Sequence, residues 1–176
     1  KGSEVWRTHD PCVWREDETW YMVSGSQQGD PRGIGTSKDA AYMFESHDLV
    51  SWDYLHPLYE PGDESDCAVP DFFPLRDKHM LLFASHSRGA QYYIGSYSDA
   101  RFLPERHGRM NYTTWDISSS YEDLYVSGDL LAPHSLEDAR GRRVMIGSIL
   151  EGRTKEAQRA AGWTGIMSLP RVLDLT

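Results

Sequence analysis

The stretch from Asp63 to Leu75, DESDCAVPDFFPL, holds the pattern that decides the fold of this chain. Three carboxylates, at Asp63, Glu64 and Asp66, and a cysteine precede a proline and an apolar, aromatic run. On its own, the pattern is typical of an acidic surface turn that leads into a buried strand. A carboxyl beside an apolar strand also has a raised pKa, which suits a general acid near neutral pH. The stretch therefore allows a structural and a catalytic interpretation.

The same kind of strand start recurs along the chain. Pro11, Pro70 and Pro133 each begin or lie within an apolar run, and they are 59 and 63 residues apart. The strand-like runs, separated by charged or glycine-containing turns, are Pro11–Trp14, Thr19–Val23, Ala41–Phe44, Trp52–Leu55, Asp71–Leu75, His79–Phe83, Gln91–Gly95, Leu130–Leu136 and Arg142–Gly147. A repeat of about 60 residues with four short strands predicts the blades of an all-β propeller.

Three such units account for the whole chain, at about 5–60, 66–125 and 126–176. Three blades cannot close a ring, so either the chain is part of a longer propeller or a second polypeptide completes it. Gly25–Gly35 is interpreted as a loop, and Pro104–Asp129 as an irregular, candidate functional loop. The best helix signal, Thr154–Ala161, predicts two turns at most.

Composition narrows the classes of partner. The formal net charge of -9 and the pI near 5.2 argue against nucleic acid or an anionic membrane. Six Trp and ten Tyr suit strands, and they also suit stacking on sugar rings. Cys12 and Cys67 are too few for a disulfide framework or a zinc site. We therefore expect no metal and no cofactor.

The first residues do not resemble a natural N-terminus. The chain starts at Lys1 without a Met, has no signal peptide, and takes up a strand-like pattern within a few residues. No run of 18 apolar residues predicts a membrane span. We expect further residues upstream. The compartment stays open, since secretion would rest only on analogy with enzymes that meet polymeric substrates outside cells.

Five motifs in order resemble glycoside hydrolase family 32, the invertase, inulinase and levanase group that acts on β-fructofuranosyl bonds. They cover nearly the whole chain: Arg7-Thr-His-Asp-Pro11, Ser46–Leu55, Cys67–Leu75, Gly128–Ser135 with Gly141–Gly147, and Trp163–Arg171. The resemblance implies a five-bladed propeller, of which this chain supplies the latter three blades, and a C-terminal β-sandwich that the chain lacks. It also implies a retaining mechanism, in which the nucleophile and the acid/base lie about 5 to 5.5 Å apart.

Carried over by motif, the resemblance gives Asp10 the role of transition-state stabiliser. It makes Arg7, His9 and Cys67 the candidate substrate-binding residues. The family has Arg directly before this Asp, whereas His9 holds that place here. The family's Trp after the Ile-Gly strand end is Ser148 in this chain. These two departures concern positions that border the sugar in the family, and they leave the substrate preference open.

The acid/base has two candidates. The family's Glu lies two residues before the Pro, where this chain has Ala68. Glu64 keeps the residue type, whereas Asp66 keeps the order of an acid followed by Cys67. A third alternative is that neither residue is catalytic.

The family's nucleophile lies in an Asn-Asp-Pro-Asn motif that this chain does not contain, and Asp30-Pro31 is not assigned to that role. We therefore expect an incomplete fragment, inactive alone, of a hydrolase that acts on sucrose, inulin or levan. The alternatives are an arabinofuranosidase- or xylosidase-like five-bladed enzyme, and a non-catalytic carbohydrate-binding propeller. Linkage, transfer against hydrolysis, and oligomeric state remain open.

Overall fold

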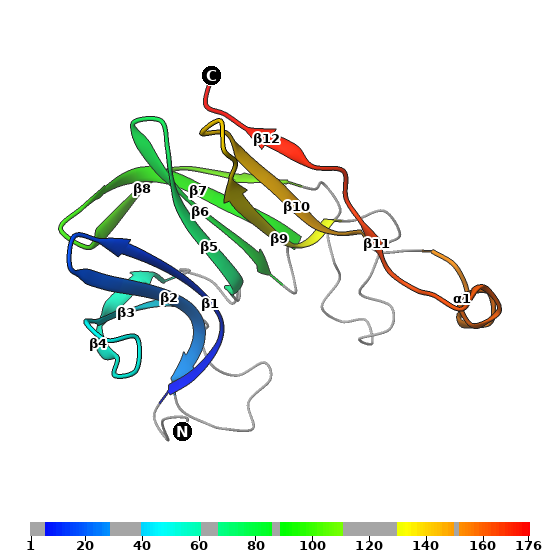
Figure 1. Cartoon of the computed structure of the whole chain (residues 1–176), viewed down its shortest axis with the longest axis horizontal. Helices are drawn as coiled ribbons and strands as arrows, with labels where there is room; N and C mark the ends of the chain where they lie inside the picture. The colour runs from blue at the N-terminus through cyan, green and yellow to red at the C-terminus, as the bar shows by residue number, and fades with distance from the viewer. Residues whose placement is uncertain (1–5, 29–39, 61–66, 86–88, 111–129, 150–151) are drawn as a thin grey trace.

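A computed structural model describes residues 6–28, 40–60, 67–85, 89–110, 130–149 and 152–176, with the side chains of residues 6–9 and 26–28 outside the description. The described residues form three antiparallel sheets of four strands each and a short helix (Figure 1). Each sheet follows the previous one along the chain, as the repeated strand starts predict. We call the sheets blades 1, 2 and 3.

Blades 1 and 2 are meanders in which each strand pairs with the next. Blade 1 consists of β1 (Trp6–Glu16), β2 (Thr19–Gln28), β3 (Ala40–Ser46) and β4 (Asp53–Tyr59). Blade 2 consists of β5 (Ala68–Leu75), β6 (Lys78–Ser85), β7 (Gly89–Ser98) and β8 (Arg101–Arg109).

Blade 3 has a divided third strand. It contains β9 (Leu130–Glu137), β10 (Arg143–Ile149), β11 (Ile166–Met167) and β12 (Arg171–Leu173). Both β11 and β12 pair with β10, on the edge opposite β9. Between them, the Ser168 amide donates to the Gly147 carbonyl at 2.8 Å, and the Gly147 amide donates to Ser168 Oγ at 3.0 Å. Ser168 therefore closes the gap between the two short strands.

Strands β5 and β6 of blade 2 are largely buried on both faces because blade 2 lies between the other two. On β5, Phe72 belongs to a cluster shared with blade 1, and Phe73 to a cluster shared with blade 3. Leu81 and Leu82 on β6 divide in the same way. Successive side chains of a strand point to opposite faces, so two adjacent apolar residues can serve two interfaces. The continuous apolar runs of β5 and β6 follow from this position.

The helix prediction is confirmed. Helix α1 (Lys155–Ala161) has Thr154 as its N-cap, and Gly162 ends it with a left-handed backbone. All residues of α1 are described and none is buried, and the helix projects away from the three blades (Figure 1).

Two loop predictions were wrong in part. β2 continues through Gly25 to Gln28, and β8 runs through Pro104 to Arg109. Pro104 is tolerated because β8 is an edge strand and because Glu105, the next residue, is the extra residue of a bulge in β8. The remainder of both predicted loops lies largely outside the described residues.

Candidate active site

The three blades share one backbone irregularity near the start of their first strands. In β1 two residues, Asp10 and Pro11, stand opposite one residue of β2, between the pairs His9↔Gly25 and Cys12↔Val23. β5 has the same bulge between Ala68 and Asp71, and β9 has it between Leu131 and His134. Such bulges bend a strand and redirect its side chains.

The residue before each proline adopts the left-handed backbone region. φ is 51° at Asp10, 46° at Val69 and 47° at Ala132. This region is uncommon for residues other than glycine, and it is a genuine outlier for a β-branched residue such as Val69. Backbone strain of this kind costs roughly 1–3 kcal/mol and is concentrated at functional sites. The bulges thus make Asp10, Val69 and Ala132 equivalent positions in three successive blades.

Asp10 lies in the bulge of β1 with an exposed side chain. An Asp tolerates the left-handed region better than most residues because its short polar side chain can satisfy local backbone groups. The carboxylate is therefore held by a bent backbone and is open to a ligand. Arg7 and His9 lie on the same strand, but their side chains are outside the described residues.

Cys67 directly precedes β5 and is fully buried. It packs in the cluster between blades 1 and 2. A Cβ added to Gly25 would lie only 1.9 Å from the carbonyl oxygen of Cys67, which is a severe clash. Gly25 is therefore required for the close approach of β2 to the start of β5. The burial of Cys67 favours a packing role over direct contact with a sugar.

A buried carboxylate connects the first strands of all three blades. Asp71 on β5 accepts hydrogen bonds through Oδ2 from the amide of Ser135 at 2.7 Å and from its hydroxyl at 2.6 Å. The thiol of Cys12 on β1 lies 3.7 Å from Asp71 Oδ1. We call Cys12, Asp71 and Ser135 the Asp71 clasp.

The clasp was not predicted from the sequence. The sequence feature that could have indicated it is the position of its residues relative to the three prolines. Cys12 and Asp71 directly follow the prolines of their bulges, and Ser135 comes two residues after the third proline. Burial raises the pKa of the Cys12 thiol to about 11, with further contributions from the charge of Asp71. Cys12 is therefore a neutral hydrogen-bond donor rather than a nucleophile.

Other chemistry is limited within the described part of the chain. There, no group of three or more His, Cys, Asp or Glu side chains is placed to hold a metal ion. Among the described helices, none is both long and apolar enough to cross a membrane.

Comparison with known proteins decides the family. The family model for the N-terminal domain of glycosyl hydrolases family 32 matches residues 3–176. The chain belongs to this family.

Relatives agree with the assignment. Sucrose-6-phosphate hydrolase from Zymomonas mobilis is 27% identical over 98% of this chain, which covers 34% of that relative. The solved structure of fructan 1-exohydrolase IIa from Cichorium intybus with 1-kestose is 26% identical, with a TM-score of 0.70 over 98% of this chain and 33% of that one. A family 32 β-fructofuranosidase from Bombyx mori with sucrose gives a TM-score of 0.71 at 21% identity, covering 96% of this chain and 35% of that one.

The chain thus spans about a third of the length of the curated relatives it matches. Its three sheets are three blades of the five-bladed family 32 propeller. The family match also argues against the arabinofuranosidase- or xylosidase-like alternative.

The bulge of β5 bears on the family's acid/base position. Pro70 lies in a bulge equivalent to those that contain Pro11 and Pro133, so it corresponds to the proline of the family motif. The residue two positions before Pro70, where the family has its Glu, is Ala68. Both predicted candidates, Glu64 and Asp66, lie outside the described residues. They precede the start of β5.

Proposed function

We propose that the protein to which this chain belongs is a retaining β-fructofuranosidase that hydrolyses sucrose-type or fructan linkages. The match of the family 32 model to residues 3–176 carries this proposal. The names of the relatives support sucrose, its 6-phosphate and fructo-oligosaccharides among the substrates to be tested. A carbohydrate partner also agrees with the acidic charge of the chain.

In this proposal Asp10 stabilises the transition state. Its carboxylate accepts hydrogen bonds from fructosyl hydroxyls, and these strengthen as positive charge develops on the ring. Its exposure and its position in the bulge of β1 support the role, since a bulge redirects the side chains of its strand. Arg7 and His9, on the same strand, are proposed to contact the substrate.

The acid/base is proposed to be Glu64 or Asp66. Either carboxyl would protonate the leaving-group oxygen and then deprotonate the attacking water. Both residues belong to the segment just before β5. Residues of β5 and β1 pack in the same apolar cluster between blades 1 and 2. Cys67, which directly follows this segment and is fully buried, is proposed to exclude water from its surroundings.

The nucleophile is proposed to lie in a part of the protein other than this chain. The relatives are about three times as long as the chain, which leaves room for the remaining blades and a β-sandwich. A retaining reaction needs its two carboxyl groups about 5 to 5.5 Å apart, so all blades must be present for turnover. We expect residues 1–176 alone to release no fructose.

One observation favours a second candidate. Ala68 occupies the place of the family's Glu, and a propeller without an acid/base would bind fructosides without cleaving them. A non-catalytic carbohydrate-binding propeller is therefore the alternative.

Fructose release by the full-length protein tests both candidates. The substrates are sucrose, sucrose 6-phosphate, 1-kestose, inulin and levan, and the anomer first released is followed by NMR. Release of the β-anomer from one or more of them is the expected result. Binding of 1-kestose in calorimetry with no turnover of any substrate would establish the non-catalytic alternative, and neither binding nor turnover would overturn the proposal.

A further inference from the structure

We propose that Asp71 is a positioning residue, which fixes the first strands of blades 1, 2 and 3 at one level and so sets the separation of the catalytic carboxyl groups. This inference rests on the proposed function. It assigns a role to a residue that forms no part of the substrate-binding set.

The contacts of Asp71 are few and directional. Only 5% of the residue is exposed, and both carboxylate oxygens have partners on neighbouring blades. Ser135 on blade 3 donates to Oδ2 twice, at 2.6 and 2.7 Å, and Cys12 on blade 1 lies 3.7 Å from Oδ1. Asp71 thereby links blade 2 to both neighbouring blades, and the Phe72 amide, which donates to the Cys12 sulfur at 3.5 Å, adds to the link with blade 1.

The groups around Asp71 are hydrogen-bond donors. The backbone amide and the hydroxyl of Ser135 donate to Oδ2, and the neutral thiol of Cys12 lies 3.7 Å from both Asp71 Oδ1 and the Phe72 carbonyl, either of which can accept its proton. Charge-assisted hydrogen bonds of this length are stronger than those between neutral groups. The positive charge of Arg143 on β10 lowers the pKa of Cys12 and so opposes, in small part, the effects of burial and of the Asp71 charge.

Burial of a carboxylate between sheets carries a large desolvation cost in free energy. Replacing buried ionic groups with apolar ones of similar volume is often neutral or stabilising, so net stability alone does not explain Asp71. Its hydrogen bonds, however, tolerate little displacement, whereas the surrounding apolar contacts would allow the sheets to slide. The clasp therefore contributes register between blades more than it contributes stability.

The clasp lies close in sequence to Asp10 and to the start of β5, which follows the segment proposed to carry the acid/base. Cys12 follows Asp10 by two residues, and Asp71 follows the start of β5 by three. At about 3.3 Å per residue, both ends of the clasp are within roughly 10 Å of those positions along the chain. A shift between β1 and β5 would displace Asp10 relative to Ala68, the first residue of β5. A displacement of about 1 Å in a reacting group can cost roughly 100-fold in rate.

The test uses the full-length protein and three variants: Ser135→Ala, Ser135→Thr and Asp71→Asn. Ser98→Ala and Asp99→Asn, at exposed positions at the end of β7 and in the turn after it, are the matched controls. We expect Ser135→Ala to lower kcat by about 10-fold or more, with KM within about twofold of wild type, because positioning acts on the transition state. Ser135→Thr, which keeps the hydroxyl donor, should restore most of kcat.

Asp71→Asn should lower kcat by at least as much as Ser135→Ala, and the double variant should lose less than the product of the two single effects. All rates are measured far below the thermal midpoint and are divided by the folded fraction. Unchanged kcat per folded molecule in both Ser135→Ala and Asp71→Asn would overturn the inference and leave the clasp a structural contact. If Asp71→Asn does not fold, the two Ser135 variants decide the matter.

A failure of the proposed function gives a different result. In that case the wild type itself releases no fructose, and the clasp is then measured through thermal unfolding of the same variants. Non-additive changes in the thermal midpoint for Ser135→Ala and Asp71→Asn would support an interaction between the two residues across blades 2 and 3. Additive changes would contradict that interaction.

Discussion

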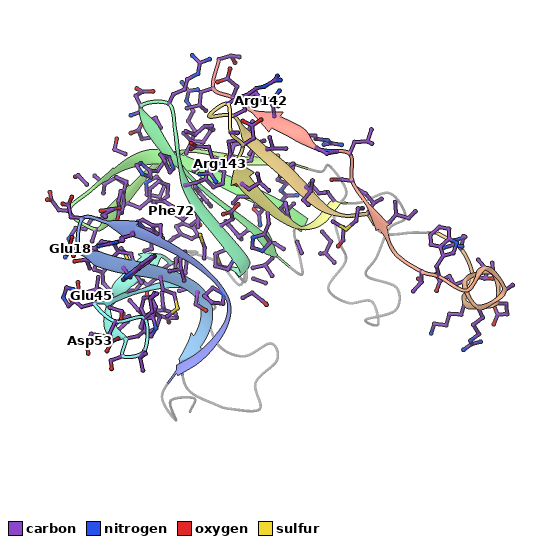
Figure 2. The ribbon with its side chains drawn as sticks, viewed as in Figure 1. Glu18, Glu45, Asp53, Phe72, Arg142 and Arg143 are labelled. Atoms are coloured by element: carbon purple, nitrogen blue, oxygen red, sulfur yellow. The ribbon has the colours of Figure 1, made fainter. Side chains whose placement is uncertain are left out.

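Phe72 and Phe73 are neighbours on β5, yet their rings belong to different cores on opposite sides of blade 2. Phe72 contacts Trp14 of blade 1, with ring centroids 5.3 Å apart, whereas Arg143 of blade 3 lies over Phe73 at 4.4 Å from its centroid. Figure 2 shows Phe72 close to blade 1 and Arg143 on blade 3, and the backbone alternation of one strand serves both interfaces.

Truncation of either ring should destabilise the propeller severely. Phe72 is 4% exposed and Phe73 is 2% exposed, so Phe72→Ala and Phe73→Ala should each lower the free energy of unfolding by about 3–5 kcal/mol. Urea denaturation of the full-length protein, followed by tryptophan fluorescence, measures the loss. Leu103→Ala, at a residue on β8 that is 68% exposed, is the control and should change stability by less than about 0.5 kcal/mol. Equal effects at Phe73 and Leu103 would contradict the interface between blades 2 and 3.

A pair of tyrosines joins the last strand of blade 1 to blade 2. The hydroxyl of Tyr59 donates to that of Tyr93 at 2.6 Å, and their ring centroids are 4.4 Å apart. A cycle of Tyr59→Phe, Tyr93→Phe and the double variant isolates this hydrogen bond from the ring packing. We expect a coupling energy of about 0.5–1.5 kcal/mol in thermal or urea unfolding. Strictly additive single effects would mean that the two hydroxyls do not interact in solution.

The stability of the protein should depend on pH through His79. Burial lowers the pKa of this imidazole below its usual value, and the charge of Glu16 opposes the shift only in part. The unfolded chain therefore binds the proton more readily, so the contribution is fully present above about pH 6.5 and is lost as the pH falls towards the folded pKa. His79→Phe keeps a ring beside Phe72, where the two rings stack at 5.3 Å. This variant should reduce the fall in thermal midpoint between pH 7.5 and 5.5, and an unchanged pH dependence would exclude His79 as its source.

Much of the fold could be predicted from the sequence because the blades repeat. Pro11, Pro70 and Pro133 mark equivalent bulges, and the local patterns after them are strong enough to give most strands. Pro104 misled the prediction, because a proline is compatible with an edge strand and only the tertiary position identifies the edge. The division of blade 3 into β11 and β12 also escaped prediction, since two- and three-residue strands carry no periodicity.

The candidate site was less predictable than the fold. Asp10 could be proposed as a site residue because it belongs to a short motif beside a recognisable strand. Asp71, Cys12 and Ser135 could not, because their hydrogen bonds cross 59 and 64 residues and depend on how adjacent blades are offset. Local sequence patterns predict the strands of a blade, whereas the offset between adjacent blades depends on tertiary packing.

The role proposed for Asp10 predicts a loss of rate without a loss of stability. Asp10→Asn keeps the shape of the side chain and tolerates the left-handed backbone at φ 51°, but it removes the negative charge. Fructose release by the full-length protein should fall by about 10²–10³-fold in kcat, while the thermal midpoint stays near that of wild type. Asp17→Asn is a close control, since Asp17 is also exposed and also has φ of 51° but lies in the β1–β2 turn. Similar losses in the two variants would rule out a specific role for Asp10.

Separate replacement of Glu64 and Asp66 should identify the acid/base. Glu64→Gln and Asp66→Asn keep the size of each side chain and remove only the proton that a general acid donates. In the catalytic member of the pair, kcat/KM for sucrose should fall by about 10²–10⁴-fold in the full-length protein. An aryl fructoside carries a leaving group that departs without a proton, so its cleavage should fall much less in the same variant. Glu137→Gln, at an exposed carboxyl at the end of β9, is the control. Full activity towards sucrose in both variants would exclude the segment before β5 as the source of the acid, and the search would then move to another blade.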